Sequence, residues 1–212
     1  GRARGMENVL VVTVGTGVGG GIIENGRLIE GRRGIGGEIG HFSIKFDGEP
    51  CPCGNRGCFE RYGSTGASYI QPCLMSHKPV DLLILMLGTN DTKEWYGATA
   101  ERICAGMEYI VCRAQNTPCW TEKGPNILVI APPPIDAGYV DTESLPEFGP
   151  GAREKSLTLA PLYEKSAKRL GCAFFDAGPV SELNRVDCLH LTRKGCRSLA
   201  AALAEIIPGL CG

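Results

Sequence analysis

The residues best suited to chemistry in the first third of the chain are one histidine and three closely spaced cysteines. His41 is followed by Cys51, Cys53 and Cys58, in the order Cys-Pro-Cys-Gly-Asn-Arg-Gly-Cys. One imidazole and three thiolates form the Cys3His ligand set of a closed, tetrahedral zinc site. The alternative is three unrelated thiols beside a surface loop, but such a density of cysteines in a reduced protein favours zinc.

A glycine-rich turn lies upstream of these cysteines. Gly15-Thr16-Gly17-Val18-Gly19-Gly20 matches G-x-G-x-x-G by letter, but a dinucleotide fingerprint must open a helix, whereas a hairpin is expected here. The N–H groups of such a turn can hold a phosphate. A tight turn between two strands explains the same glycines equally well.

A second group of candidate residues lies in the last two thirds of the chain. Asp187 precedes His190 by three residues, a spacing at which a carboxylate can orient the imidazole of a catalytic triad. Asn90 follows an apolar run and can donate an amide N–H to an oxyanion. The alternatives are a plain loop leading into a helix for the first pair, and a turn or a helix cap for Asn90-Asp91.

The elements around the glycine turn and the cysteines are expected to be short strands. Asn8 to Val14 predicts a buried strand, and the Asn25-Gly26 dipeptide between Ile22-Ile23 and Leu28-Ile29 predicts a hairpin. Another short strand is expected at Phe42 to Phe46.

After Ser64, apolar runs of strand length alternate with stretches of helical periodicity. We expect a polar loop at 136–151, and Pro208 is expected to end the last helix. This alternation predicts a parallel, doubly wound sheet. The expected strands are 82–87, 126–131 and 172–176, and the expected helices are 99–113, 157–170 and 193–207.

The composition is ordinary for a globular protein and excludes several classes of partner. The net charge of -1 gives no reason to expect nucleic acid or an anionic membrane. The longest apolar run, Leu82 to Leu87, is too short to cross a bilayer, and no signal peptide is evident, so a cytoplasmic location is expected. The 11 cysteines are an odd number without the spacing of a disulfide scaffold, so those outside the cluster are expected to be reduced.

The first 64 residues together resemble the ROK family of sugar kinases and repressors. The matching stretches are Gly15-Thr-Gly-Val-Gly-Gly-Gly21, Gly37-Glu-Ile-Gly-His41 and Cys51-x-Cys-Gly-x-x-Gly-Cys58-x-Glu60. This resemblance implies structural zinc on the Cys3His set, and ATP as a cofactor if the chain is a kinase.

The same resemblance implies binding roles for residues that would otherwise be ordinary. It implies sugar contacts from Glu38, His41 and Glu60. It implies nucleotide phosphate near Gly15, Thr16, Gly17 and Gly19. The family's phosphate loop and catalytic aspartate would lie before residue 1, so we expect no sugar phosphorylation.

Residues 66–212 resemble the SGNH, or GDSL-type, hydrolases, in particular their aryl esterase and acyltransferase branch. The resemblance implies that His190 is the general base, Asp187 its orienting carboxylate and Asn90 an oxyanion donor, acting on small carboxylic or aryl esters. The matching stretches are Gly66-Ala-Ser-Tyr69, Met86-Leu-Gly-Thr-Asn-Asp-Thr-Lys93, Ala131-Pro-Pro-Pro134, Phe175-Asp-Ala-Gly178 and Asp187-x-x-His190.

The nucleophile of that family is not found in this sequence. The chain contains no Gly-Asp-Ser triplet, and the block that supplies a glycine N–H to the oxyanion hole is not found either. We expect Asn8 to Val14 to dock beside Leu82 to Leu87 in place of the family's first strand. The turn after it has Gly17 at the serine position and Thr16 one residue out of register. Catalysis is therefore expected to be impaired.

Taken together, the sequence predicts an α/β chain that joins two families. We expect an incomplete, flavodoxin-like SGNH-hydrolase sheet of three layers, preceded by a β-hairpin and the zinc knuckle of a ROK (actin-like ATPase) domain. The expected domains are 1–64 and 65–212. The predicted function is that of an impaired ester hydrolase or acyltransferase, with a ROK sugar-kinase fragment and a non-enzymatic fusion as alternatives. The expected partner is a small ester or sugar, and an oligomer is compatible with the sequence.

Overall fold

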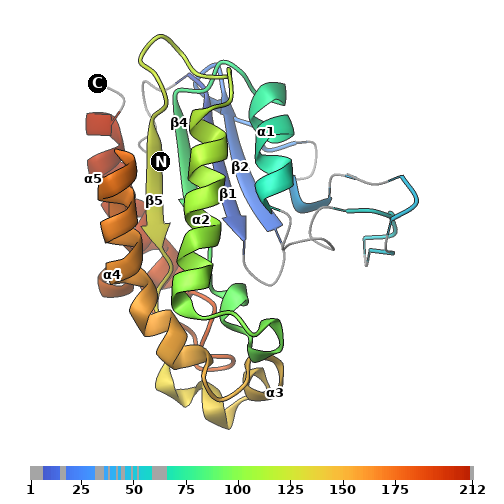
Figure 1. The fold of residues 1–212 in the computed structure, drawn as a ribbon, viewed down its shortest axis with the longest axis vertical. Helices are drawn as coiled ribbons and strands as arrows, with labels where there is room; N and C mark the ends of the chain where they lie inside the picture. Colours follow the sequence, from blue (N-terminus) through green and yellow to red (C-terminus); the bar gives the residue numbers. More distant parts are fainter. Residues whose placement is uncertain are drawn as a thin grey trace.

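A six-stranded sheet forms the centre of the described part of this chain, in the order β3-β2-β1-β4-β5-β6 (Figure 1). The computed structural model describes residues 7–14, 18–31, 36–37, 39–41, 43, 46–48, 50–51, 53–58 and 66–210. The strands are β1 Val9–Val14, β2 Val18–Glu24, β3 Arg27–Leu28, β4 Leu82–Met86, β5 Ile127–Ala131 and β6 Ala173–Asp176.

Four of the strands, β1, β4, β5 and β6, run parallel to one another. Parallel strands are covered on both faces, which is why β4 and β5 consist of continuous apolar runs. The predicted parallel sheet is therefore confirmed for these strands. The long helices that cover it are α1 Gly66–Ser76, α2 Ala100–Gln115, α4 Ala152–Leu170 and α5 Arg193–Leu210.

Strand β1 joins the first part of the chain to the second. It pairs in parallel with β4, from Val9 opposite Leu82 to Thr13 opposite Met86. This confirms that the first strand docks beside 82–87. Strands from both expected domains, 1–64 and 65–212, therefore lie in one hydrogen-bonded sheet.

The hairpin of β2 and β3 extends this sheet in the antiparallel direction. Asn25 and Gly26, at its tip, have φ angles of 50° and 71°, the left-handed conformations that a two-residue type I′ turn requires. The predicted hairpin is thus confirmed.

A glycine segment that leads toward the cysteines covers the outer side of β2. A Cβ atom on Gly37 would lie 2.5 Å from the carbonyl oxygen of Gly20 in β2, so only glycine permits this approach. The strand expected at Phe42 to Phe46 is limited, among the residues described, to an isolated bridge between Ser43 and Cys58.

Helices cover the two faces of the sheet unequally (Figure 1). Side chains alternate along a strand, so Leu83 and Leu85 of β4 pack in the core under α1, α2 and α4, whereas Leu82 and Ile84 pack in the cluster under α5. Three helices thus lie on one face and α5 on the other, which gives the three layers predicted. None of the helices in the described ranges combines the length and apolarity needed to cross a bilayer.

Three expectations drawn from the sequence are wrong: one concerns the segment 136–151 and two concern the ends of helices. The segment 136–151 is not an irregular loop, because it contains a 3-10 helix, Ala137–Asp141, and the short helix α3, Ser144–Phe148. Buried Tyr139 and Phe148 belong there to one cluster with Ile135 and with Cys188, which lies on the loop after β6; the Gly- and Pro-rich sequence conceals this packing.

The other two errors concern helix ends. Helix α4 begins at Ala152 rather than at 157, and α5 continues through Pro208 to Leu210. A proline in the last turn removes only one backbone hydrogen bond, so the helix tolerates it there.

We predict that β1 stabilises the whole sheet rather than a separate domain. Leu10 in β1 is 1% exposed, whereas Leu28 in β3 is 58% exposed. Leu10→Ala should lower the free energy of unfolding by about 2–5 kcal/mol, because it leaves a cavity in the main core. Leu28→Ala, the matched control, should change it by less than about 0.5 kcal/mol. The measurement is urea unfolding followed by the fluorescence of Trp120, which packs on that core; equal midpoints for both variants would contradict the shared core.

Candidate functional site

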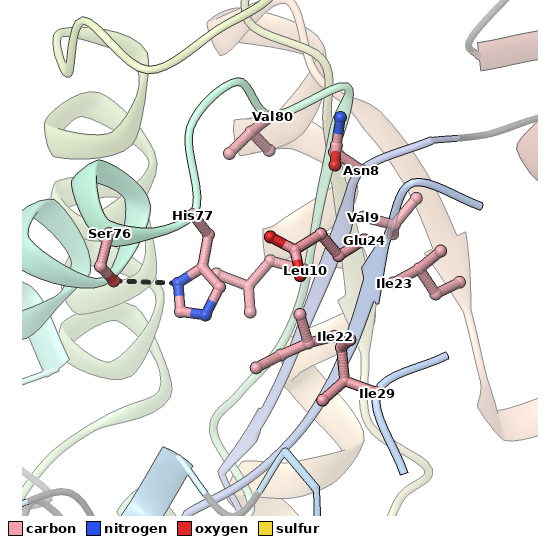
Figure 2. A pocket seen from close by; sticks show the side chains of 10 residues that line it. All are labelled: Asn8, Val9, Leu10, Ile22, Ile23, Glu24, Ile29, Ser76, His77 and Val80. Carbon is pink, nitrogen blue, oxygen red and sulfur yellow. Dashed lines mark hydrogen bonds between the residues drawn. The ribbon is translucent and has the colours of Figure 1, made fainter. Parts of the chain in front are cut away.

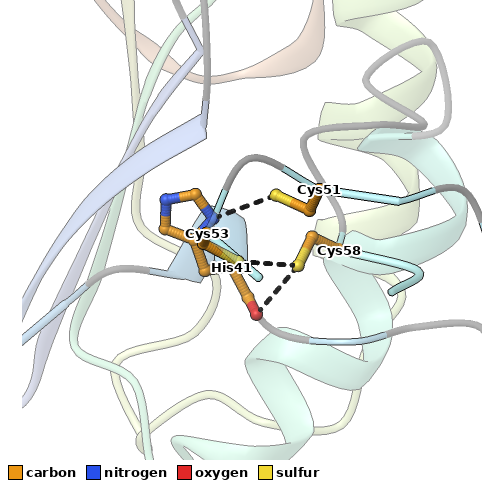
Figure 3. Close-up of side chains that lie close together, drawn as sticks. All are labelled: His41, Cys51, Cys53 and Cys58. Carbon is orange, nitrogen blue, oxygen red and sulfur yellow. Dashed lines mark hydrogen bonds between the residues drawn. The ribbon is translucent and has the colours of Figure 1, made fainter. Parts of the chain in front are cut away.

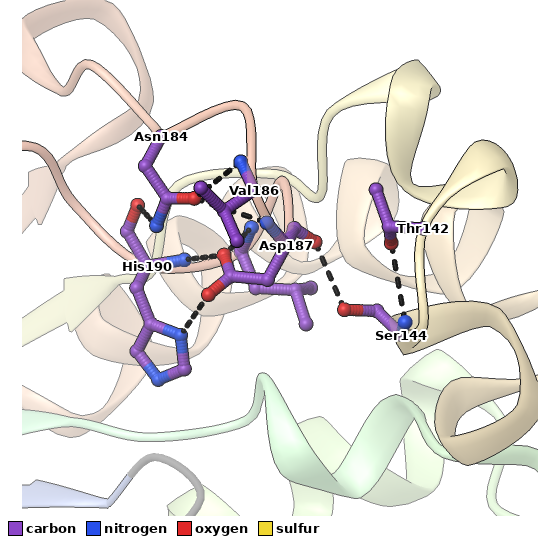
Figure 4. A network of polar contacts seen from close by, with 7 residues as sticks. Thr142, Ser144, Asn184, Val186, Asp187 and His190 are labelled. Atoms are coloured by element: carbon purple, nitrogen blue, oxygen red, sulfur yellow. Dashed lines mark hydrogen bonds and ion pairs between the residues drawn. The ribbon is translucent and has the colours of Figure 1, made fainter.

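Asp187 and His190 form a hydrogen-bonded pair on the loop between β6 and α5 (Figure 4). The imidazole Nδ1 lies 2.9 Å from Oδ2 of the carboxylate. Because a carboxylate only accepts, Nδ1 carries the hydrogen, and the basic lone pair of the neutral ring is on Nε2. This is the arrangement in which a carboxylate orients a general base, as predicted from their spacing.

The loop that holds this pair is closed by its own polar groups (Figure 4). The side-chain oxygen of Asn184 accepts hydrogen bonds from the N–H groups of Val186 and Asp187, while its amide nitrogen donates to the carbonyl of His190. The hydroxyl of Ser144 donates to the carbonyl of Asp187 at 3.0 Å. Asn184 and Ser144 are thus positioning residues that the sequence reasoning missed.

The carboxylate of Asp187 is held in its ionised form. Burial is the largest single influence and opposes ionisation, but the N–H groups of His190 and Leu189 and the imidazole of His190 together lower the pKa to about 2. Both backbone N–H groups donate to Oδ1 at 2.9 Å. A carboxylate that stays charged at neutral pH can stabilise an imidazolium beside it.

Asn90 lies just beyond β4, at the start of a 3-10 helix, Asn90–Thr92. The loop that holds Asp187 and His190 follows β6. Because the carboxyl ends of parallel strands meet at one edge of a sheet, the structure brings all three predicted catalytic residues to that edge. The hydroxyl of Tyr163 holds the end of β4 by donating to the carbonyl of Leu87 at 3.0 Å. Tyr163 lies 76 residues away in sequence, so no local signal could identify it.

The four predicted zinc ligands also come together (Figure 3). The donor atoms of His41, Cys51, Cys53 and Cys58 all lie within 4.8 Å of one another. Sγ of Cys51 is 3.6 Å from Nδ1 of His41, and the Sγ atoms of Cys53 and Cys58 are 3.5 Å apart. With bonds of about 2.3 Å, a tetrahedral zinc ion would hold its sulfur ligands roughly 3.8 Å apart, so the donor set fits this metal.

The knuckle backbone supports this convergence. The N–H of Cys51 donates to the carbonyl of Asn55 at 2.9 Å, and Gly54 adopts a φ of 94° that other residues avoid. The pKa of the Cys53 thiol is lowered, chiefly by a backbone hydrogen bond from Asn55 and further by the neighbouring thiols and His41, although burial opposes the shift. A lowered pKa favours the thiolate, the form that binds metal. Zinc bound there would supply a structural cross-link rather than reaction chemistry.

The remaining predicted site residues are not brought into a described site. Gly19 lies within β2, opposite Thr13 of β1, and so is part of an antiparallel strand pair. The other five lie outside the described residues: Gly15, Thr16, Gly17, Glu38 and Glu60.

Comparison with known proteins finds the ROK family in the first part of the chain and esterase structures over most of it. The sequence signature of the ROK family matches residues 1–71. The glucokinase of Thermotoga maritima is 45% identical over 67 residues, which cover 32% of this chain and 21% of that enzyme. The chain therefore spans about a fifth of the length of the curated relatives that it matches.

Solved structures of esterases match most of the chain. A carbohydrate acetylesterase family member from Sinorhizobium meliloti is 31% identical with a TM-score of 0.64, and the match covers 80% of this chain and 76% of that one. The native aryl esterase of M. smegmatis is 32% identical with a TM-score of 0.62, covering 78% of this chain and 74% of that one.

We predict that the purified chain binds about one zinc ion per molecule through the four converging ligands. Cys51→Ser should lower the zinc content severalfold, because it removes a ligand and the tetrahedral set cannot close. Cys196→Ser changes an exposed thiol in α5 and should leave it unchanged. Metal analysis after dialysis measures both; a parent protein without zinc, or equal loss in both variants, would contradict the assignment.

Proposed function

We propose that this chain binds small carboxylic or aryl esters and hydrolyses them poorly. It belongs to the family of the carbohydrate acetylesterases and aryl esterases, and residues 1–71 form a ROK-type segment. The observation that carries this proposal is the hydrogen bond between Asp187 and His190 at the carboxyl edge of the sheet. If an alcohol replaces water as the acceptor of the acyl group, the same site would catalyse acyl transfer instead of hydrolysis.

The proposed roles follow from the chemistry of the three side chains. Nε2 of His190 takes the proton of the attacking hydroxyl group, and Asp187 keeps the ring oriented and stabilises its positive charge. The side-chain amide of Asn90 donates to the oxygen that becomes negative in the tetrahedral intermediate. What this set lacks is a covalent nucleophile.

The missing nucleophile accounts for the impairment. In this family the serine follows the first parallel strand, and β1 holds that position beside β4. The residues that follow β1 are Gly15-Thr16-Gly17, where a Gly-Asp-Ser motif would be needed. Loss of a triad serine costs on the order of 10^6-fold in turnover, so the parent chain should act close to the background rate.

We predict that restoring the motif restores activity. The double variant Thr16→Asp, Gly17→Ser should raise turnover of p-nitrophenyl acetate at least about 100-fold over the parent, because it supplies the Gly-Asp-Ser serine that serves as the nucleophile in the resembled family. Adding His190→Ala should abolish the gain, whereas adding Arg197→Ala, an exposed change on α5, should not.

Two results would contradict this proposal. A double variant that stays folded by circular dichroism but gains nothing would show that the turn after β1 is not aligned with the pair. Clear activity in the parent that disappears with His190→Ala would show that another serine, such as Ser64, already serves as the nucleophile.

A sugar kinase is the second candidate, favoured by the metal cluster and by the ROK match. That match ends at residue 71, and β1 and its hairpin are built into the esterase sheet. Phosphoryl transfer requires nucleotide and sugar to be held in line, which takes two complete lobes in this family.

We therefore predict no hexose-dependent consumption of ATP by the pure protein. A coupled assay with glucose and N-acetylmannosamine measures this, with a ROK glucokinase as the positive control. Turnover that rises with hexose concentration and is lost in His41→Ala would make the kinase the correct assignment.

A further inference from the structure

A small cavity lies at the edge of the sheet opposite the Asp187–His190 pair (Figure 2). Its volume is about 220 Å³, and it lies between the hairpin of β2 and β3 and the segment that joins α1 to β4. Asn8 and Val9, at the start of β1, and Val80, before β4, mark it as the amino-terminal edge of the parallel strands. Both the ROK-type segment and the esterase part therefore contribute to its wall.

The inner wall of this cavity is apolar. Leu10 and Val80 are each only 1% exposed, and Ile22 and Ile29 line the side formed by the hairpin (Figure 2). An apolar surface of this kind favours a compact hydrocarbon group, because burial removes that group from water.

The imidazole of His77 offers a hydrogen-bond acceptor at the rim of the cavity. Nδ1 of His77 lies 2.9 Å from the carbonyl oxygen of Cys73, which only accepts, so Nδ1 carries the hydrogen. Nε2 of the neutral ring is then an acceptor, and in Figure 2 it points away from Ser76 and into the space between the strands and the helix. Nδ1 also contacts the hydroxyl of Ser76 at 2.9 Å, which fixes the ring.

Glu24 places a carboxylate on the same cavity. Arg27 lies opposite Glu24 in the hairpin register, yet no ion pair joins them among the described residues. The lining includes no lysine or arginine, and the carboxylate of nearby Asp81 accepts the N–H of Asn8 at 3.0 Å. Among the residues that the structure describes, the lining is thus acidic and contains no cationic side chain.

We propose that this cavity binds a small primary ammonium ion with a compact apolar body. The ammonium group would donate to the Glu24 carboxylate and to Nε2 of His77, while the apolar body would lie on Leu10, Ile22 and Val80. The cavity would hold roughly seven water molecules at about 30 Å³ each, so a ligand with a similar number of heavy atoms fills it. Because the site spans both parts of the chain, the ligand also stabilises their joint fold.

Benzylamine is a suitable probe, with benzyl alcohol as its uncharged counterpart. The readout is the ring-proton resonance of His77 in a titration at neutral pH, identified by its loss in His77→Gln. Benzylamine should shift this resonance in a saturable manner and raise the melting temperature. Benzyl alcohol should bind more weakly, because it offers no charge to Glu24.

Variants of two exposed glutamates complete the test. Glu24→Gln should weaken benzylamine binding about threefold to fivefold, the effect of one exposed ion pair. Glu30→Gln, just beyond the hairpin and outside the cavity lining, should leave it unchanged. Equal affinity for amine and alcohol, or equal effects of the two substitutions, would overturn the assignment of a cation. A His77 resonance that responds to neither compound would overturn the site itself.

Discussion

The parallel pairing of β1 with β4 is the interaction on which the rest of this structure depends. It places Leu10 on the face covered by α1, α2 and α4, and Val9 on the face covered by α5. The hydrogen bonds between strands are formed by backbone groups. A strand therefore fits into a parallel sheet mainly if its side chains are apolar on both faces. A strand from the ROK-like segment can therefore complete a sheet that resembles those of the esterase structures, without side chains matched to that position.

The same pairing determines where chemistry can occur. The carboxyl ends of β1, β4 and β6 lie at one edge of the sheet, so the described segments that follow β4 and β6 meet there. The carboxylate and imidazole of Asp187 and His190 are held by local hydrogen bonds, and the end of β4 is held by Tyr163. The geometry of Asp187 and His190 therefore does not depend on contacts with the residues that follow β1.

Much of this arrangement could be predicted from the sequence because its signals are local. The apolar runs identified the strands, Asn25-Gly26 identified the hairpin, and the cysteine spacing identified the convergence of the thiols with His41. The parts of the fold that could not be predicted depend on contacts between residues distant in sequence. Helix α1 contains Pro72, which hides its helical pattern, and burial of Tyr139 and Phe148 in one cluster with Cys188 organises a segment that has the composition of a loop.

Positioning residues were hidden for the same physical reason. Ser144 contacts the backbone of Asp187 across 43 residues of sequence, and Tyr163 contacts that of Leu87 across 76. Neither side chain belongs to a sequence motif. Each reaches the backbone group that it holds only after the helices have packed on the sheet. The pair of Asp187 and His190 can be found by its spacing, whereas the residues that support it can be found only from the fold.

Gly37, which precedes the His41–Cys58 cluster, packs against the edge of β2. Strand β3 pairs with only the last residues of β2, Ile23 and Glu24, and Gly37 packs over Gly20 farther along the same edge. That segment continues into His41, so an ion held there would tether the cover in place. An uncovered strand edge is a template on which another chain can add a strand. If the cluster holds zinc, removing the ion is therefore expected to expose this edge to pairing between molecules before the core is lost.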